Sequence, residues 1–296
     1  MTLRHCSSLC IRLIALEAGQ FTGRALRDWV LKVASGAAIA AMSTCVLAHD
    51  TWFRLAPRQP GSGLLALQLG EGTRYPKNEG VIPGSRVIGA GCVDEQGRKS
   101  ALLPRSEDGI LELRSRLSNA RAAACWLELP PVELQLTPEL VKVYFDEIHA
   151  SPAVREVWEA QQKSGVGWRE VYRKFVRVEL PVPGAAQRDP VSAGALRRAH
   201  GFPLELVPLG EAFVQTGVPA EYQALADGKP VAGLPVQFVS VRSPLGIWTQ
   251  TDAQGRIRFS LPFGGEWLLR ATALEPPSSA QAPWRSRFAT LTVQVQ

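Results

Sequence analysis

The chain has 296 residues, with 33 Lys and Arg against 27 Asp and Glu, for a formal net charge of +6. Residues 1–48 contain five of the basic and two of the acidic side chains, so the remainder carries 28 against 25. That remainder has no clustered basic segment of the kind that binds nucleic acid, which excludes this class of partner. Its roughly 250 residues suffice for one large domain or two smaller ones.

The first 48 residues have the order of a secretory signal. Lys32 precedes the apolar, small-residue run 33–46, and Ala48 stands at a cleavage position. The run is shorter than the roughly 20 apolar residues of a spanning helix, so we expect cleavage after Ala48 and a periplasmic product without a membrane span. The stretch before Lys32 is long for a signal, which points to a start downstream of Met1. A retained anchor and lipid attachment at Cys45 remain alternatives.

Residues 49–182 are expected to form an N-terminal β-sandwich. Short apolar runs separated by Gly and Pro are typical of sandwich strands, and they occur at 64–69, 86–93, 110–113 and 122–129. Asp94-Glu95-Gln96-Gly97 predicts a hairpin turn between two of these runs.

Three of the five cysteines lie in the leader, which leaves Cys92 and Cys125. An even number of cysteines in an exported chain favours a disulfide, and each of the two lies in a strand-like run. We therefore expect one bridge between neighbouring strands, with two buried free thiols as the alternative.

A helical insertion is expected over residues 137–176, at the end of the first domain. Thr137-Pro138-Glu139 and Ser151-Pro152 each combine a capping hydroxyl with a proline at the first helical position. Apolar residues then follow at helical spacing. A third helix is predicted from the spacing of Trp168, Val171, Tyr172 and Phe175.

Residues 183–203, rich in Pro, Gly, Ala and Arg, are expected to form an exposed linker or a long crossing loop. The last part, residues 204–296, predicts a second β-sandwich of the immunoglobulin-like or prealbumin-like kind. Turn signals at Asp227-Gly228 and at Asp252-Ala253-Gln254-Gly255 separate alternating apolar runs. The expected fold is therefore mainly β, with two such sandwiches and a helical insertion at the end of the first.

His49 would become the first residue after cleavage, and this makes it a candidate metal ligand. A terminal histidine offers its α-amino group and its imidazole to one metal ion, which an internal histidine cannot do. Asp50 or one of the remaining histidines, His149 and His200, could complete such a site. Nitrogen-rich ligation suits copper(II) and nickel(II), and both nitrogens must lose protons to bind, so affinity should fall below neutral pH. His149 is otherwise expected at a helix end and His200 exposed in the linker.

Four segments together resemble a family of exported bacterial proteins, the domain-of-unknown-function family DUF4198. They are 48–53 around His49, 201–209, 227–233 with 251–256, and 288–293. Members of this family are often labelled as the periplasmic component of an ABC-type cobalt or nickel uptake system. The resemblance implies transition-metal handling, with an inner-membrane metal transporter as partner. His49 is the only candidate ligand that the resemblance supports. Residues 267–273, where relatives often have another histidine, contain none.

The sequence thus predicts a periplasmic protein that binds nickel, cobalt or copper and assists its uptake or delivery. It has no nucleophile elbow and no phosphate-binding glycine loop, so an enzyme is not expected. A non-metal interaction module of the cell envelope is the alternative, because a sandwich fold does not decide function. A third interpretation is an oxidative copper enzyme, which needs a second histidine brought to His49.

Overall fold

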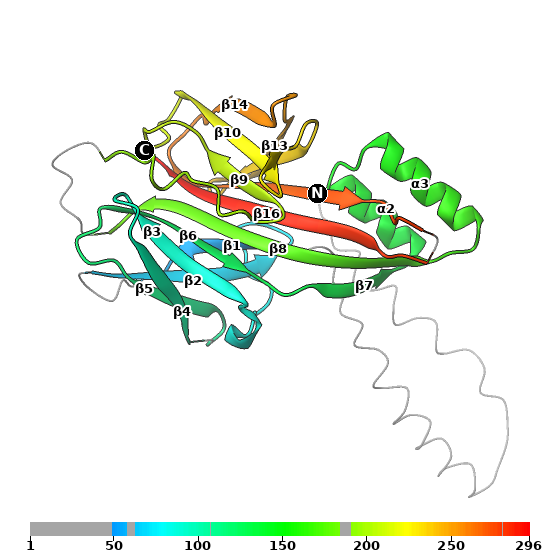
Figure 1. The fold of residues 1–296 in the computed structure, drawn as a ribbon, viewed down its shortest axis with the longest axis horizontal. Helices are drawn as coiled ribbons and strands as arrows, with labels where there is room; N and C mark the ends of the chain where they lie inside the picture. The colour runs from blue at the N-terminus through cyan, green and yellow to red at the C-terminus, as the bar shows by residue number, and fades with distance from the viewer. Residues whose placement is uncertain (1–48, 58–62, 107, 184–190, 280) are drawn as a thin grey trace, which may run out of the picture. The chain divides into compact units, whose positions relative to one another are not determined.

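The computed structural model describes residues 49–57, 63–106, 108–183, 191–279 and 281–296. The predicted leader, residues 1–48, lies outside this part of the chain. The described residues confirm a mainly β, sandwich-like fold with a helical insertion (Figure 1). Neither of the described helices combines the length and the hydrophobicity needed to cross a membrane.

The first half of the fold contributes eight strands and two helices in the order β1 (Asp50–Leu55), β2 (Leu64–Gly72), β3 (Gly89–Asp94), β4 (Lys99–Ser106), β5 (Leu111–Arg116), β6 (Ala122–Glu128), β7 (Val132–Leu136), α2 (Pro138–Glu147), α3 (Pro152–Lys163) and β8 (Trp168–Pro181), with a short 3-10 helix at Gly84–Arg86. The second half contributes β9 (Glu205–Pro208), β10 (Pro219–Ala226), β11 (Lys229–Pro230), β12 (Pro235–Ser240), β13 (Ser243–Gln250), β14 (Arg256–Ser260), β15 (Gly265–Glu275) and β16 (Trp284–Val295).

One sheet of twelve strands runs through both halves. Its order is β1-β2-β5-β4-β3-β6-β8-β16-β15-β12-β13, with β7 also paired to β8. The two halves meet where β8 and β16 pair in parallel, from Glu170 opposite Trp284 to Glu179 opposite Val293. The other described strand pairs are antiparallel, and Figure 1 shows β8 and β16 side by side. The large sheet is continuous across the boundary between the predicted domains 49–182 and 204–296. The division of the chain into these two domains stays a prediction.

The second half of strand β8 is covered on both faces, which explains the unbroken burial from Lys174 to Leu180. Val176, Val178 and Leu180 alternate along one face and join the first core, together with Phe53, several leucines of β2 and β5, and both cysteines. Phe175 points the other way, into a second core beneath the small sheet of β9, β10, β11 and β14. Arg177 lies on this second face and forms a buried ion pair with Glu205 at the start of β9.

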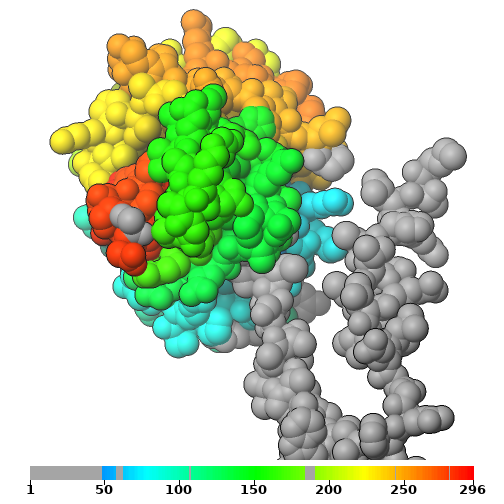
Figure 2. Space-filling view, turned by 90° about the vertical axis from the view of Figure 1, so that its right-hand side faces the viewer, coloured from blue at the N-terminus to red at the C-terminus, as the bar shows by residue number. Residues whose placement is uncertain are grey.

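The predicted helix starts are confirmed. The hydroxyl of Thr137 accepts a hydrogen bond from Leu140 N (3.4 Å), and that of Ser151 accepts one from Val154 N (3.4 Å). Both helices pack over one end of β8 and β16, where Trp168 and Trp284 stack at 4.6 Å. Figure 2 shows the helices in green beside the start of β16 in red.

The predicted third helix is wrong, because Trp168–Pro181 is strand β8. The apolar spacing that suggested a helix combines residues from both faces of a strand that is buried on both sides. The alternation of Val176, Val178 and Leu180 with Arg177 and Glu179 is the period of two that a strand shows. The helical insertion therefore ends with α3.

The described part of the predicted linker packs against the sheet instead of lying exposed. Ala193 and Leu196 are fully buried against alanines of β6. Arg197 reaches Glu179 on β8 through a buried ion pair at 2.7 Å. The segment thus behaves as a crossing loop that is fastened to β8, and residues 184–190 lie outside the described part.

The expected disulfide is confirmed. Cys92 on β3 and Cys125 on β6 are directly opposed in the antiparallel register and are bonded. Both are fully buried in the first core. The predicted turns are also present: Asp94 and Asp252 accept backbone hydrogen bonds from the residues of their own turns, and Asp227-Gly228 has the positive φ values of a type I′ hairpin.

We predict that replacing both cysteines with alanine lowers the free energy of unfolding by about 3–4 kcal/mol, because the bridge closes a loop with a sequence separation of 33 residues. Urea denaturation of the variant and of the wild-type chain, each with and without reductant, measures this. Reductant should destabilise the wild type and leave the variant unchanged. Equal midpoints for oxidised and reduced wild type would contradict the prediction.

Candidate functional site

The predicted ligand His49 immediately precedes β1, and that strand is held firmly. Besides its pairing with β2, β1 receives two hydrogen bonds from threonines of β16: Thr290 Oγ1 donates to Thr51 O (2.6 Å) and Thr292 Oγ1 to Phe53 O (2.9 Å). The position where His49 leaves the sheet is therefore fixed by the second half of the chain.

A glutamate that the sequence analysis did not single out lies beside His49. The distance from His49 Nε2 to Glu79 Oε2 is 3.9 Å, and about a quarter of each side chain is exposed. Thr73 orients this carboxylate with two hydrogen bonds, from its backbone N (2.8 Å) and from its hydroxyl (3.0 Å). The backbone hydrogen bond from Thr73 is the main cause that lowers the pKa of Glu79, with smaller contributions from the Thr73 hydroxyl, His49 and Lys77. The carboxylate therefore stays ionised and can act as a ligand.

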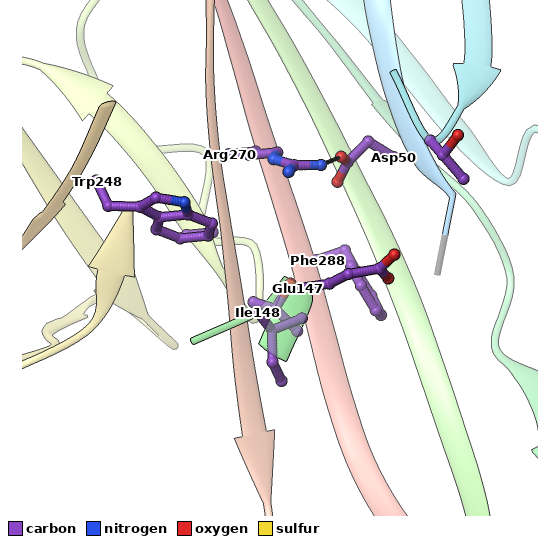
Figure 3. A pocket seen from close by; sticks show the side chains of 9 residues that line it. Asp50, Glu147, Ile148, Trp248, Arg270 and Phe288 are labelled. Carbon is purple, nitrogen blue, oxygen red and sulfur yellow. Dashed lines mark hydrogen bonds and ion pairs between the residues drawn. The ribbon is translucent and has the colours of Figure 1, made fainter. Parts of the chain in front are cut away.

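Asp50 points to a different partner. Its carboxylate forms an ion pair with Arg270 on β15, and Arg270 Nε also donates to Gln237 Oε1 (2.5 Å). The pair borders a small pocket of about 50 Å³ that is also lined by Thr73, Glu147, Ile148, Trp248 and Phe288. Figure 3 shows Arg270 between Asp50 and Trp248, with Glu147 and Phe288 below them. The structure thus places Asp50 against a cation, and Asp50 as a metal ligand stays a prediction.

Glu147, the last residue of α2, brings a second carboxylate to this pocket. Burial is the main cause that raises its pKa, and the negative charge of Asp50 raises it further, while Arg270 acts in the opposite direction. Arg270 therefore interacts with both carboxylates, as an ion pair with Asp50 and at longer range with Glu147. Glu147 takes up a proton more readily than an ordinary glutamate does.

His149 lies just beyond α2, as expected, with a positive φ of 53°. Its exposed ring stacks on Trp248 at 3.8 Å. Trp248 in turn lines the pocket of Asp50 and Arg270. Three of the predicted residues, His49, Asp50 and His149, are thus placed around one region of the fold, although the described residues bring no group of three or more His, Cys, Asp or Glu together in a metal-binding arrangement.

His200 lies elsewhere and is half-buried instead of exposed. Its ring stacks on Trp126 at 3.9 Å, and its Nε2 is buried without a hydrogen-bond partner. Burial, together with the positive charges of Arg177 and Lys99, lowers its pKa from 6.5 to about 3. A neighbourhood that repels a proton also repels a metal cation, so the surroundings of His200 are those of a packing histidine.

This environment predicts a pH-dependent stability. An unfolded histidine takes up a proton near pH 6.5, whereas folded His200 does so only near pH 3. Between these values the unfolded state binds more protons than the folded state. The stability that neutral His200 provides is therefore fully present above pH 6.5 and is lost as the pH falls towards 3. His200→Phe keeps an aromatic ring on Trp126 but cannot take up a proton. We therefore expect the free energy of unfolding of this variant, relative to that of the wild type, to be about 1–2 kcal/mol higher at pH 4.5 than at pH 7.5. Urea denaturation at both pH values measures it. A stability difference that does not change with pH would refute the account.

Comparisons with known proteins identify a family and name no function. A search of curated proteins found no match. A similar solved structure, described as a "tetra-tandem repeat in extending region of large adhesion protein", aligns with 83% of this chain and 50% of its own length, with 9% identity and a TM-score of 0.20, a value too low to indicate a shared fold. The family model described as "Domain of unknown function (DUF4198)" matches residues 46–275. Because this match spans most of the sequence, the chain belongs to the DUF4198 family.

Proposed function

We propose that this chain is a periplasmic protein that binds a divalent transition metal (nickel, cobalt or copper) at its mature N-terminus and assists the uptake or delivery of that metal. The observation that carries the proposal is the 3.9 Å approach of His49 Nε2 to Glu79 Oε2, at the residue that cleavage after Ala48 would make the first. An imidazole and an oriented carboxylate meet there. In the terminal chelate the free α-amino group and His49 Nδ1 would bind the metal, and Glu79, which lies at Nε2, would hold the ring in position.

This donor set fits a transported metal better than a structural one. Amine and imidazole nitrogens are ligands that nickel(II), cobalt(II) and copper(II) accept, whereas a closed structural zinc site needs four protein ligands. A site built on a terminal chelate leaves coordination positions open, through which a metal can be handed on to another protein. His49 and Glu79 are also partly exposed, so a donor or acceptor can reach them.

Two observations support export. The basic, apolar and small-residue order of residues 32–48 is that of a signal peptide, and the family match begins only at residue 46. An inner-membrane metal transporter is the proposed partner, since a periplasmic carrier needs a route into the cell.

We predict that a chain beginning at His49 binds copper(II) and nickel(II) at least about tenfold more tightly than the same chain acetylated at the α-amino group of His49, since acetylation removes that nitrogen from the chelate. Glu79→Gln should weaken binding by a similar factor. Glu156→Gln, on the exposed face of α3, is the matched control and should bind as the wild type does. Isothermal titration with each metal measures all four chains.

Equal affinities of the free and the acetylated chain would exclude the terminal chelate. Loss of binding in Glu79→Gln alone would instead assign the metal to Glu79 and other side chains. If no chain binds metal, the protein does not have the proposed function.

An interaction module of the cell envelope is the second candidate, and one observation favours it. Strand β13 lies at the edge of the large sheet, and its Leu245 is 79% exposed while Ile247 projects from the same face. Edge strands with exposed apolar side chains are surfaces to which partner strands add. The oxidative copper enzyme has no such support, because the rings of His149 and His200 stack on tryptophans.

A further inference from the structure

A second cavity adjoins the pocket of Asp50 and Arg270. It measures about 290 Å³ and is lined by Thr73, Arg74, Tyr75, Gln237, Val239 and Arg270. Thr73 and Arg270 also line the smaller pocket, so the two spaces share a wall. The larger one is near the lower end of the range of about 300–1,000 Å³ for small-molecule sites, which suits a small metabolite and not a peptide.

Arg270 presents a fixed cation to this cavity. Its Nη1 is paired with Asp50 and its Nε with Gln237 Oε1, which leaves Nη2 without a partner among the described residues. Gly246 on β13 permits this arrangement, because a Cβ at that position would collide with the Gln237 amide. The guanidinium is therefore oriented before any ligand arrives, which lowers the entropic cost of binding.

Arg74 supplies a second cation on the same wall. It is exposed and forms no ion pair with any described residue. The acid nearest to its neighbour Tyr75 is already engaged, since Glu266 accepts from the Tyr75 hydroxyl and pairs with Arg54 at 2.6 Å. Two guanidinium groups thus line the cavity. Asp50 and Glu147 act on Arg270 from the adjoining pocket, so Arg74 is the cation without an acidic partner among the described residues.

From this arrangement we infer that the cavity binds a small organic acid with two or more carboxylates, held between Arg74 and Arg270. The planar guanidinium fork matches a carboxylate with two parallel hydrogen bonds. Val239 and the ring of Tyr75 provide apolar surface for a carbon skeleton, which an inorganic anion lacks. This inference goes beyond the proposed metal site and requires neither His49 nor a metal.

The test uses succinate and citrate as probes, titrated into the metal-free chain at constant ionic strength. We expect wild-type binding with a Kd below about 1 mM and at least about tenfold weaker binding in Arg74→Gln. Arg74 is exposed and makes no ion pair, so this variant should fold normally, and its thermal unfolding verifies that. Arg116→Gln, which removes an exposed arginine of β5 outside the cavity, is the matched control and should bind as wild type does.

Three results would overturn the inference: no heat of binding for either acid up to about 10 mM, equal weakening by Arg74→Gln and Arg116→Gln, or inorganic phosphate binding as tightly as succinate. The first two would show that the cavity has no specific affinity, and the third that it takes any anion. Because no metal is present, failure here is distinguishable from failure of the proposed function.

Discussion

The parallel pairing of β8 with β16 is the constraint on which the rest of the structure depends. It joins the strands of residues 50–181 with β12, β13, β15 and β16 of the second half into one sheet. Strand β8 then has a hydrophobic core on each face, and the charged residues of its second face are buried against β9 and the crossing loop. Arg177 pairs with Glu205 and Glu179 with Arg197, and losing one partner of such a pair would leave a buried charge unpaired.

The candidate sites exist because the two halves meet there. Asp50 and Arg54 of β1 pair with Arg270 and Glu266 of β15, and threonines of β16 bind the backbone of β1. His49, which precedes β1, is therefore held at a defined place by residues more than 200 positions away. The proposed metal site and the proposed acid-binding cavity share Thr73, which orients Glu79 beside His49 and also lines the cavity.

Features that depend on neighbouring residues could be predicted from the sequence. The capped helix starts at Thr137 and Ser151, the Asp-Gly turns and the strand runs all follow from local backbone chemistry, and the disulfide follows from the number of cysteines in an exported chain. Features set by tertiary packing could not. The apolar spacing of residues 168–175, which lie in a strand buried on both faces, resembled that of a helix. No local sequence pattern indicates that Glu79 will lie beside His49 or that Arg270 will pair with Asp50. His200 appeared exposed because the polar loop around it gives no sign that its ring packs on Trp126.

The central claim is that His49 begins the mature chain, since its α-amino group is otherwise locked in a peptide bond. Intact mass spectrometry of the protein recovered from the periplasm of cells that export it tests this most directly. The account predicts the mass of residues 49–296 with the Cys92–Cys125 bridge formed. A mass that retains residues before His49, or a lipid on Cys45, would contradict it.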